Sequence, residues 1–530
     1  MSNLRIAAID LGSNSFHLLV AETKPDGSFI PLVREKEMLR LGDIVARHGV
    51  LTDQAVASAV EVVGRFKALA EAREVDELLA YGTAALRVAG NGASAVDAIE
   101  SATGVRVKVI SGIREAQLIF EAVKASVLIE SGPALCADLG GGSLELSVGD
   151  RSGLVFATSL HLGVGKLTAE FVKSDPPAKK ALSKLRERVE EELATVMDDV
   201  LDAGPKGLIG SSGTMCAIVR ASAALRDGAV PLSLNQLTVA AKDVAAFGKL
   251  AVSLTTEKRA RLPGIDAKRA ELLPAGVAVA EVLLEETGFV ELTASEWAMR
   301  EGMILAAIGK HDRADLTGDP REIRRASVMS LCRRSGWKQR HGFSVATAAV
   351  QLFDATAELH RLEGVDRELL ELAGLLHDIG EQVSRDGHGR HTAYLIENGG
   401  LRGFDPEEVN LLVCLGRYHT RGRPRESFAA FDALAGDDRA RCLWLLSLLR
   451  IADGMDVSHA SLVLSVEAAV SGREVAIMAK CRGDADLEKW VFQRKKGLFE
   501  ELCGRPCRFE PTSVGPDEFD AARAGGAGLG

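Results

Sequence analysis

The sequence lacks any long stretch of apolar residues. Nowhere do about 18 uncharged apolar residues follow one another, which is roughly the length that a membrane-spanning helix needs. The N-terminus also lacks a basic segment followed by an apolar stretch and a cleavage pattern. These absences predict a soluble protein without a membrane partner.

Cysteine is scarce, with only eight scattered among 530 residues. Cys503 and Cys507 lie close together, but no second pair or nearby His completes a zinc site, so we interpret them as structural. Scattered thiols in apolar stretches are typical of a reducing compartment, which predicts a cytoplasmic protein without a disulfide framework. The thiols in such stretches are Cys136, Cys216, Cys414 and Cys442.

Positive charge is in deficit, because 64 Lys and Arg residues face 74 Asp and Glu residues and the net charge is −10. A protein this acidic is a poor general binder of nucleic acid, so we expect no nucleic-acid partner. Basic clusters within 321–340 and 417–425 interrupt this background and predict a polyanion-binding surface, with a solvated face as the alternative. Their members include Arg333, Arg334, Lys338, Arg340 and Arg421.

Apolar residues, in contrast, are sufficient for several domains. The chain is 47% hydrophobic and 26% charged, as in globular proteins, and it exceeds the roughly 250–300 residues of a single core. Strand-like and helix-like segments alternate first, as an α/β fold requires, and mostly helical segments follow from about residue 315. We expect lobes at 1–130 and 131–312, a helical domain at 313–460, and a small α/β domain at 461–530 with a frayed tail.

A glycine-rich turn at 140–142 stands between two strand-like segments. Its glycines allow backbone N–H groups to approach an oxyanion such as phosphate. Asp138 and Glu145 bracket the turn and have the oxygen ligands that a divalent cation prefers. A glycine-rich hairpin with exposed acids is the alternative.

The same strand–turn–strand motif occurs near the N-terminus, where an apolar strand leads into Asp10-Leu11-Gly12-Ser13-Asn14-Ser15 and a second strand follows. The two copies lie 128 residues apart, from Asp10 to Asp138. This repetition predicts duplicated lobes with a phosphate between two facing loops. A third strand-to-glycine turn, at 207–215, offers hydroxyl and N–H groups to another phosphate.

Local patterns place two further candidates. A strand over 77–87 is expected to deliver Arg87, whose guanidinium suits phosphate, to a loop or helix start. A strand over 105–110 and a helix over 114–123 put Glu115 in the first helical turn. Glu115 is then either a simple helix-start acid or a carboxylate aimed at the cleft. Helical spacing over 51–72 indicates a helix with Thr52 or Asp53 as its N-cap.

In the helical region, His341, His377-Asp378 and Asp453 lie on separate predicted helices. Imidazoles and carboxylates on neighbouring helices can bind a divalent metal. A buried His–Asp pair that holds helices together is the structural alternative.

Six motifs occur in a fixed order: Asp10–Ser15, Gly82–Arg87, Ser111–Ala116, Asp138–Glu145, Gly210–Thr214 and Leu273–Gly276. Together they resemble the exopolyphosphatase / guanosine pentaphosphate phosphohydrolase (Ppx/GppA) family over residues 1–310. Residues 320–460 resemble the helical HD-type domain of the longer members, whose pattern the His341, His377, Asp378 and Asp453 set matches. One departure is Leu144, where relatives often have Thr; its hydroxyl is not required by the chemistry below.

The resemblance implies actin-like, ribonuclease-H-like lobes with a cleft that releases terminal orthophosphate from inorganic polyphosphate, or the 5′-γ-phosphate from guanosine pentaphosphate, with Mg²⁺. It implies that Glu115 is the general base, that Arg87 stabilises the transferred charge, and that Asp138 and Glu145 bind Mg²⁺. A monovalent cation as activator and a homodimer through the C-terminal helical region are also implied. The phosphate-binding residues would be Gly12, Ser13, Asn14, Ser15, Gly140, Gly141, Gly142, Ser143, Ser211, Gly213 and Thr214.

Phosphoanhydride cleavage needs mainly positioning, charge neutralisation and one base for water, and no Ser-His-Asp or Cys-His constellation is evident. The basic clusters would then form a track for a long polyphosphate chain, which favours polyphosphate over guanosine pentaphosphate. Three alternatives remain: a regulator that binds guanosine penta- or tetraphosphate without turnover, an actin-fold kinase or chaperone ATPase, and activity in the HD-type site alone.

Overall fold

The computed structural model describes residues 4–24, 27–129, 132–311 and 320–514, and its chain divides into two units. The first is Met1–Ile323 with Arg402–Pro406, and the second is Arg324–Leu401 with Glu407–Gly530. The frayed tail expected at 521–530 lies outside the described residues, as does the side chain of Arg321 in the first basic cluster. Among the described helices, none combines the length and apolarity needed to cross a bilayer. All eight cysteines are unpaired, as expected for reduced thiols.

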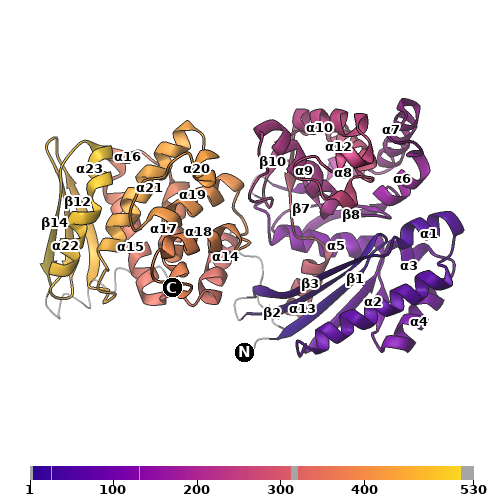
Figure 1. Ribbon diagram of the computed structural model, residues 1–530, viewed down its shortest axis with the longest axis horizontal. Coiled ribbons are helices and arrows are strands. Elements are labelled where there is room, and N and C mark those ends of the chain that lie inside the picture. Colours follow the sequence, from indigo (N-terminus) through magenta and orange to yellow (C-terminus); the bar gives the residue numbers. More distant parts are fainter. Residues whose placement is uncertain (1–3, 25–26, 130–131, 312–319, 515–530) are drawn as a thin grey trace. The chain divides into compact units, whose positions relative to one another are not determined.

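The first lobe is built on a five-stranded sheet in the order β3-β2-β1-β4-β5, of which strands β1 to β3 are labelled in Figure 1. Strands β1 to β3 form an antiparallel meander, and β4 and β5 run parallel to β1. The strands are β1 (Arg5–Leu11), β2 (Ser15–Thr23), β3 (Phe29–Met38), β4 (Glu77–Gly82) and β5 (Val107–Val109). The helices between them are α1 (Leu41–His48), α2 (Asp53–Glu71), α3 (Ala84–Val88), α4 (Gly92–Thr103) and α5 (Gly112–Lys124).

Strand β1 is apolar on both faces because helices cover the sheet on both sides. Ala7 and Ile9 pack with residues of α2 and α4 such as Phe66. Ile6 and Ala8, which point the other way, pack with α5 and with α13 (Met299–His311). Helix α13 therefore belongs to the first lobe by packing, although its sequence follows that of the second lobe and was expected within 131–312.

The second lobe repeats this arrangement in the order β10-β11-β9-β6-β7-β8. Strands β6 to β8 again form an antiparallel meander, and β9 and β11 run parallel to β6. From its other edge the second sheet runs β8-β7-β6-β9-β11, which repeats the first sheet strand for strand, with β10 as an additional edge strand. This repetition confirms the predicted duplication. The strands are β6 (Ala134–Leu139), β7 (Leu144–Gly149), β8 (Leu154–Leu160), β9 (Leu208–Ser211), β10 (Thr238–Ala240) and β11 (Glu291–Ala294).

The helices of the second lobe surround a large aliphatic core, in which Leu144 is fully buried. They are α6 (Val164–Phe171), α7 (Lys179–Ala194), α8 (Met197–Asp202), α9 (Ser212–Asp227), α10 (Ala241–Ser253), α11 (Thr256–Arg259), the short 3₁₀ helix η1 (Ala267–Arg269) and α12 (Leu273–Thr287).

The second unit is mostly helical to residue 454 and ends in a three-stranded sheet, in the order β12-β13-β14. Two helices lie within residues 461–510, between β13 and β14. The elements are α14 (Pro320–Arg334), α15 (Gln339–Ala355), α16 (Ala357–His360), α17 (Gly364–Leu376), η2 (Ile379–Gln382), α18 (His388–Glu397), α19 (Pro406–Tyr418), α20 (Ala429–Asp432), α21 (Gly436–Gly454), β12 (Val463–Val470), β13 (Val475–Cys481), α22 (Asp486–Lys495), α23 (Gly497–Cys503) and β14 (Cys507–Ser513).

Candidate active site

Two glycine bends face each other in the first unit. One joins β1 to β2 and the other joins β6 to β7. A Cβ atom on Gly141 would lie 2.8 Å from the Cβ of Asn14, and one on Gly142 would lie 2.5 Å from the Oγ of Ser13. Such distances exclude any side chain at these glycines without rearrangement. The bends therefore face each other in direct contact, as the repeated motif predicts, and the phosphate expected at these loops stays a prediction.

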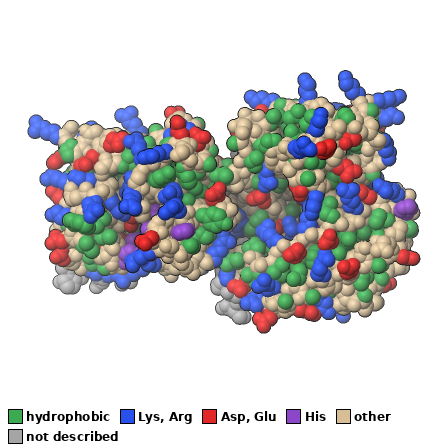
Figure 2. All heavy atoms as spheres, in the orientation of Figure 1, with side chains coloured by type: hydrophobic (Ala, Val, Ile, Leu, Met, Phe, Trp, Pro, Cys, Tyr) green, Lys and Arg blue, Asp and Glu red, His purple; other side chains and the backbone are tan. Residues whose placement is uncertain are grey.

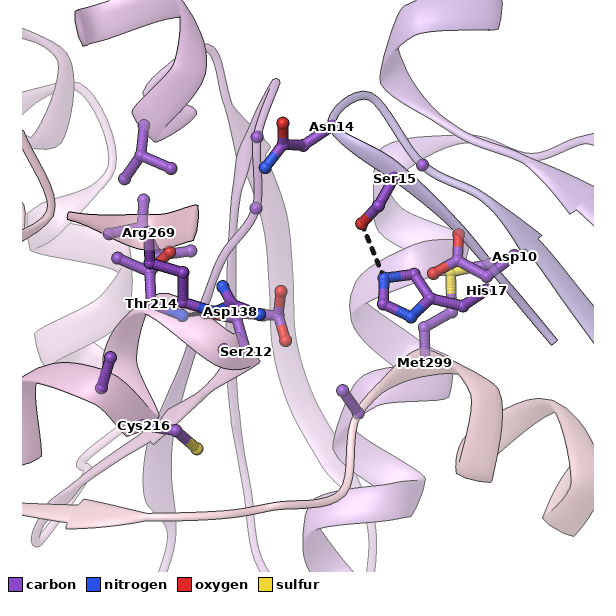
Figure 3. Close-up of a pocket in the computed structure, with 18 of the residues that line it drawn as sticks. Asp10, Asn14, Ser15, His17, Asp138, Ser212, Thr214, Cys216, Arg269 and Met299 are labelled. Carbon is purple, nitrogen blue, oxygen red and sulfur yellow. Dashed lines mark hydrogen bonds between the residues drawn. The ribbon is translucent and has the colours of Figure 1, made fainter. Parts of the chain in front are cut away.

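A cavity of about 390 Å³ opens beside these bends. Both bends line it, together with Ser212, Gly213 and Thr214 at the start of α9. Figure 3 shows Asp10, Ser15 and His17 on one side of this space, and Asp138, Thr214 and Arg269 on the other. Backbone N–H groups and hydroxyls of three loops thus meet in one hollow, which is suited to an anion.

Four interacting carboxylates form a cluster at and behind the cavity, and two further acids, Asp266 and Glu296, also line it. Asp138 and Glu145 are directly opposite each other on the antiparallel strands β6 and β7. Asp10, Asp138 and Glu115 line the hollow, whereas Glu145 is buried behind it and accepts a hydrogen bond from Ser159 Oγ at 2.8 Å. The Oδ1 of Asp10 is buried without a hydrogen-bond partner. A buried acceptor without a partner is costly, so this oxygen is suited to a cationic ligand.

Burial and mutual repulsion raise the pKa values of these acids. Burial, opposed mainly by Arg300, raises the pKa of Asp10 to about 7. Burial also raises the pKa of Asp138 to about 6, although a hydrogen bond from Ser211 lowers it. The pKa of Glu145 is raised to about 7 by burial and by repulsion from Asp138. Glu115 has a pKa well above its usual range, because it is buried and near Glu145. Strongly perturbed groups in a cleft mark a candidate functional site.

Helix α5 presents Glu115 to the cavity from its first turn. The Oγ of Ser111 caps the helix by accepting a hydrogen bond from the backbone N–H of Arg114 at 3.2 Å. Arg87 Nη1 lies 3.4 Å from Glu115 Oε2 and donates to the backbone carbonyl of Ile110 at 2.7 Å. Arg87 is not among the residues that line the cavity. The guanidinium of Arg87 thus lies beside the base candidate, and its predicted role in stabilising the transferred charge stays a prediction.

Cationic side chains line the same cavity. They come from segments far apart in the sequence: Lys36 from β3, Arg269 from η1, and Arg300 from α13. Burial, together with the nearby Arg269, lowers the pKa of Lys36 to about 8. Arg300 donates to His17 Nδ1 at 3.2 Å, so His17 carries its proton on Nε2 and donates to Ser15 Oγ at 2.8 Å. Acids and cations in one hollow are suited to a cation–polyanion complex.

Ser211 differs from its expected contact with phosphate. Its side chain is fully buried, and its hydroxyl donates to Asp138 Oδ2. The next residue, Ser212, has a positive φ of 77° and lines the cavity. At Gly213 a Cβ atom would collide with the guanidinium of Arg269, so glycine there lets this Arg approach the loop.

Sequence reasoning missed Asp10, His17, Lys36, Arg269 and Arg300 as site residues. For Asp10 the signal was available, because it occupies in the first motif the place that Asp138 occupies in the second. No local signal marks the other four, whose segments only the fold brings together.

In the second unit, the structure brings the four predicted metal ligands together. His341 Nε2 lies 3.6 Å from Asp378 Oδ2 and 3.8 Å from Asp453 Oδ1. His377 Nε2 has the same two distances to these oxygens.

The predicted basic track is exposed, but several of its members have contacts within the second unit. Arg334 donates to the backbone carbonyl of Gly399, Lys338 pairs with Glu381, and Arg340 donates to the carbonyl of Ala460 at 2.8 Å. Arg333 and Arg421 are exposed. Their role as a track stays a prediction.

Comparison with known proteins gives two family matches. The model of the Ppx/GppA phosphatase family matches residues 19–311, and that of Ppx/GppA phosphatase, domain III, matches residues 323–475. Exopolyphosphatase 1 of Mycobacterium leprae is 34% identical over 304 residues, which are 57% of this chain and 89% of that protein. The guanosine-5′-triphosphate,3′-diphosphate pyrophosphatase of Aeromonas hydrophila is 30% identical over 424 residues, 77% of this chain and 79% of that one.

Solved structures resemble the two-lobed part. An exopolyphosphatase from Cytophaga hutchinsonii has a TM-score of 0.54 and 27% identity, and the match covers 58% of this chain and 98% of that one. The Aquifex aeolicus member of the Ppx/GppA family has a TM-score of 0.51 and 26% identity, with 58% and 99% covered. These matches support an actin-like pair of α/β lobes in the first unit.

Proposed function

The chain belongs to the Ppx/GppA phosphatase family, and from this premise we propose that it is an exopolyphosphatase that hydrolyses the terminal phosphoanhydride bond of inorganic polyphosphate. The observation that carries the proposal is the pair of facing glycine bends beside four carboxylates and several cations. Phosphoryl transfer depends mainly on positioning and on neutralising negative charge, and this hollow has groups for both.

We propose that Mg²⁺ binds at Asp10, Asp138 and Glu145. The donor set fits, because carboxylate oxygens are the ligands that Mg²⁺ prefers. The unpartnered Oδ1 of Asp10 and the raised pKa values of all three acids also favour a bound cation. When bound, Mg²⁺ would neutralise charge on phosphate oxygens. The bends would hold the phosphate through their N–H groups and hydroxyls, and Arg269 and Arg300 would bind its remaining charge.

Glu115 would be the general base, and one of its carboxylate oxygens would accept a proton from the attacking water. Its helix-start position aims it at the hollow, and a bound cation would favour the ionised form that a base requires. Arg87 would position Glu115 through the contact at 3.4 Å. We propose that the cations that line the cavity, in place of Arg87, stabilise the negative charge of the transferred phosphoryl group.

Guanosine pentaphosphate is the second candidate substrate, because the Aeromonas relative named for a guanosine polyphosphate is similar over 77% of this chain. The cavity favours polyphosphate. Among the described residues that line it, none is Phe, Tyr or Trp, the side chains on which a guanine base would stack. Cytoplasmic location, a homodimer and a monovalent activator stay predictions.

The test of the proposed function is orthophosphate release from long-chain polyphosphate and from guanosine pentaphosphate, each measured with and without Mg²⁺. We expect Mg²⁺-dependent release that is faster from polyphosphate and needs no nucleotide. Faster release from guanosine pentaphosphate would favour the second candidate. Binding of either compound without release would indicate a regulator, and a strict requirement for ATP would indicate a kinase or chaperone-type ATPase.

The carboxylate cluster predicts a pH-dependent stability. The pKa of Asp10 is about 7 in the fold against 3.8 ordinarily, and that of Glu145 is about 7 against 4.5. A raised acid pKa means that the folded form holds the proton more tightly, so stability falls as pH rises from about 4 to about 7. We expect the midpoint of thermal unfolding without divalent metal to fall over this range. Added Mg²⁺ should restore it more at pH 8 than at pH 5, and equal restoration at both would contradict the site.

The basic track predicts a dependence on chain length. We expect Arg333→Gln with Arg421→Gln to raise the KM for long polyphosphate by several-fold, because each lost cation removes an attraction for a polyanion. The KM for short chains should stay unchanged. Initial rates against substrate concentration, for a long and a short polyphosphate, measure both. Lys489→Gln, which removes a charge from α22 elsewhere in the same unit, is the control; equal loss for both lengths would remove the track.

A further inference from the structure

Six side chains that could hold a metal ion meet in the second unit, four of them predicted from sequence and two not; a seventh, His459, stacks on the ring of His341 with the ring centroids 3.9 Å apart. The predicted four are joined by His388, at the start of α18, and by His419, which follows α19. His341, His377 and His419 are buried, and the side chains of Asp378, Asp453 and His388 are 13–16% exposed. Figure 2 shows histidine side chains beside an acidic side chain on the visible face of this unit. The cluster is therefore built into the core with one side open to solvent.

The carboxylate of Asp378 divides this cluster into two groups. Its Oδ2 lies 3.6 Å from the Nε2 atoms of both His341 and His377. Its Oδ1 lies 3.2 Å from the Nε2 of His388 and 3.1 Å from that of His419. Asp453 joins the first group, with Oδ1 3.8 Å from each of its imidazole nitrogens. One carboxylate thus has a pair of imidazoles on each of its oxygens.

Hydrogen bonds fix the tautomer of three of the histidines. Their Nδ1 atoms lie within hydrogen-bond distance of backbone carbonyls: His377 with Gly374 at 2.7 Å, His388 with Arg385 at 3.0 Å, and His419 with Gly416 at 2.9 Å. A carbonyl only accepts, so each Nδ1 carries the proton, and a neutral ring then presents a bare Nε2 lone pair. The Nδ1 of His341 lies 2.8 Å from the carboxylate of the buried Asp456, which favours the same tautomer. Such partners are characteristic of metal-bound histidine.

The lone pairs converge in two places. The Nε2 atoms of His341 and His377 are 3.1 Å apart, and those of His388 and His419 are 2.9 Å apart. Two neutral imidazoles with protonated Nδ1 atoms have no proton to share at these contacts, and the oxygens of Asp378 add negative charge beside each pair. Each convergence is therefore suited to a cation, either a second proton on one ring or a metal ion that both rings bind.

We propose that this cluster binds two divalent transition-metal ions bridged by Asp378. His341, His377 and Asp453 would hold one ion, and His388 and His419 the other. Imidazole ligands favour ions such as Mn²⁺, Fe²⁺ or Zn²⁺ over the Mg²⁺ proposed for the all-carboxylate cleft. The second ion has only three protein ligands, which leaves positions on the open side for water or for a phosphate oxygen, as in two-metal phosphohydrolases. Lys495 pairs with Asp453 and would position this carboxylate as a ligand of the first ion.

The test is the metal content of the full chain, loaded with Mn²⁺ and dialysed against millimolar Mg²⁺ so that Mg²⁺ fills the cleft. We expect two Mn²⁺ ions per chain by elemental analysis, with the electron paramagnetic resonance spectrum of a coupled pair. His388→Asn should leave one Mn²⁺ with a single-ion spectrum, and Asp378→Asn should lose the coupled signal. His391→Asn, on the same helix as His388 but outside the cluster, is the matched control and should keep both ions.

One Mn²⁺ or none in the wild-type chain would overturn the two-ion proposal, as would an unchanged content in His388→Asn. Circular dichroism of each variant shows whether it is folded, and His388→Asn is the milder change because its side chain is partly exposed. The proposal does not rest on the cleft chemistry. Asp138→Asn should abolish phosphate release from polyphosphate while both Mn²⁺ ions remain, so failure of one proposal is distinguishable from failure of the other.

Discussion

Replacing Glu115 with Gln is expected to slow phosphate release from polyphosphate by about 10²–10⁴-fold, the usual contribution of a general base. Gln has nearly the same shape but cannot accept the proton of the attacking water. The contact with Arg87 would weaken, yet the cavity would keep its glycine bends and its other carboxylates. We therefore expect kcat to fall with little change in KM, measured from initial rates of orthophosphate release.

The control lies on the same helix. Glu121, in the last turns of α5, pairs with Lys124 and is not among the residues that line the cavity. Glu121→Gln should therefore leave the rate unchanged. The variants should also differ in their pH profiles. At saturating Mg²⁺, which keeps the metal-binding acids ionised, the acidic limb of the wild-type profile reports protonation of the base. It should persist in Glu121→Gln and vanish in Glu115→Gln. A Glu115→Gln enzyme with wild-type kcat would remove the residue from the reaction.

Local sequence predicted the parts of the site that lie within single turns. The bends at Gly12 and Gly140 are strand–turn–strand units, so the residues that make them are adjacent in the chain. The position of Glu115 follows from the cap at Ser111 one turn before it. Thr52 likewise caps α2, where its Oγ accepts from the backbone N–H of Ala55 at 3.3 Å, as helical spacing indicates.

What sequence missed depends on contacts between distant segments. Helix α13 follows the second lobe but packs on the first, and this crossing brings Arg300 to His17, 283 residues away. Ser211 and Ser212 are neighbours, and only the backbone turn between β9 and α9 decides which of them faces the cavity. His388 and His419 belong to no spacing pattern that includes Asp378, since one starts α18 and the other follows α19, and only the packing of these helices brings them to Asp378.

Asp10 shows why the duplicated motif predicts more than either copy alone. Asp10 and Asp138 are the second-to-last residues of the equivalent strands β1 and β6, and both line the cavity. They lie close enough for the charge of Asp138 to raise the pKa of Asp10. Each lobe thus contributes the aspartate of its own copy of the motif to the same site. This arrangement is unfavourable for an ion-free fold and favourable for one that binds a cation, so activity and stability should respond to Asp10 in opposite directions.

We therefore expect Asp10→Asn to lower phosphate release by at least about 10²-fold, the scale of losing one electrostatic contact to the transition state, and to raise thermal stability without metal at pH 8. The gain arises because Asn removes a buried charge whose Oδ1 lacks a partner, and because Asp138 and Glu115 lose a repulsive neighbour. Its buried amide costs less than a buried carboxylate.

Thermal unfolding from pH 5 to pH 8, with and without Mg²⁺, measures the second half of this prediction. In the wild-type chain, stability without metal falls as pH rises toward the pKa of about 7 at Asp10. In Asp10→Asn this slope should be shallower and the stabilisation by Mg²⁺ smaller. Asp97→Asn, an exposed change on α4 of the same lobe, should behave as wild type in both assays. If Asp10→Asn lost activity and stability together, the carboxylate would be supporting the fold itself, and the cation site would have to be built from the other acids.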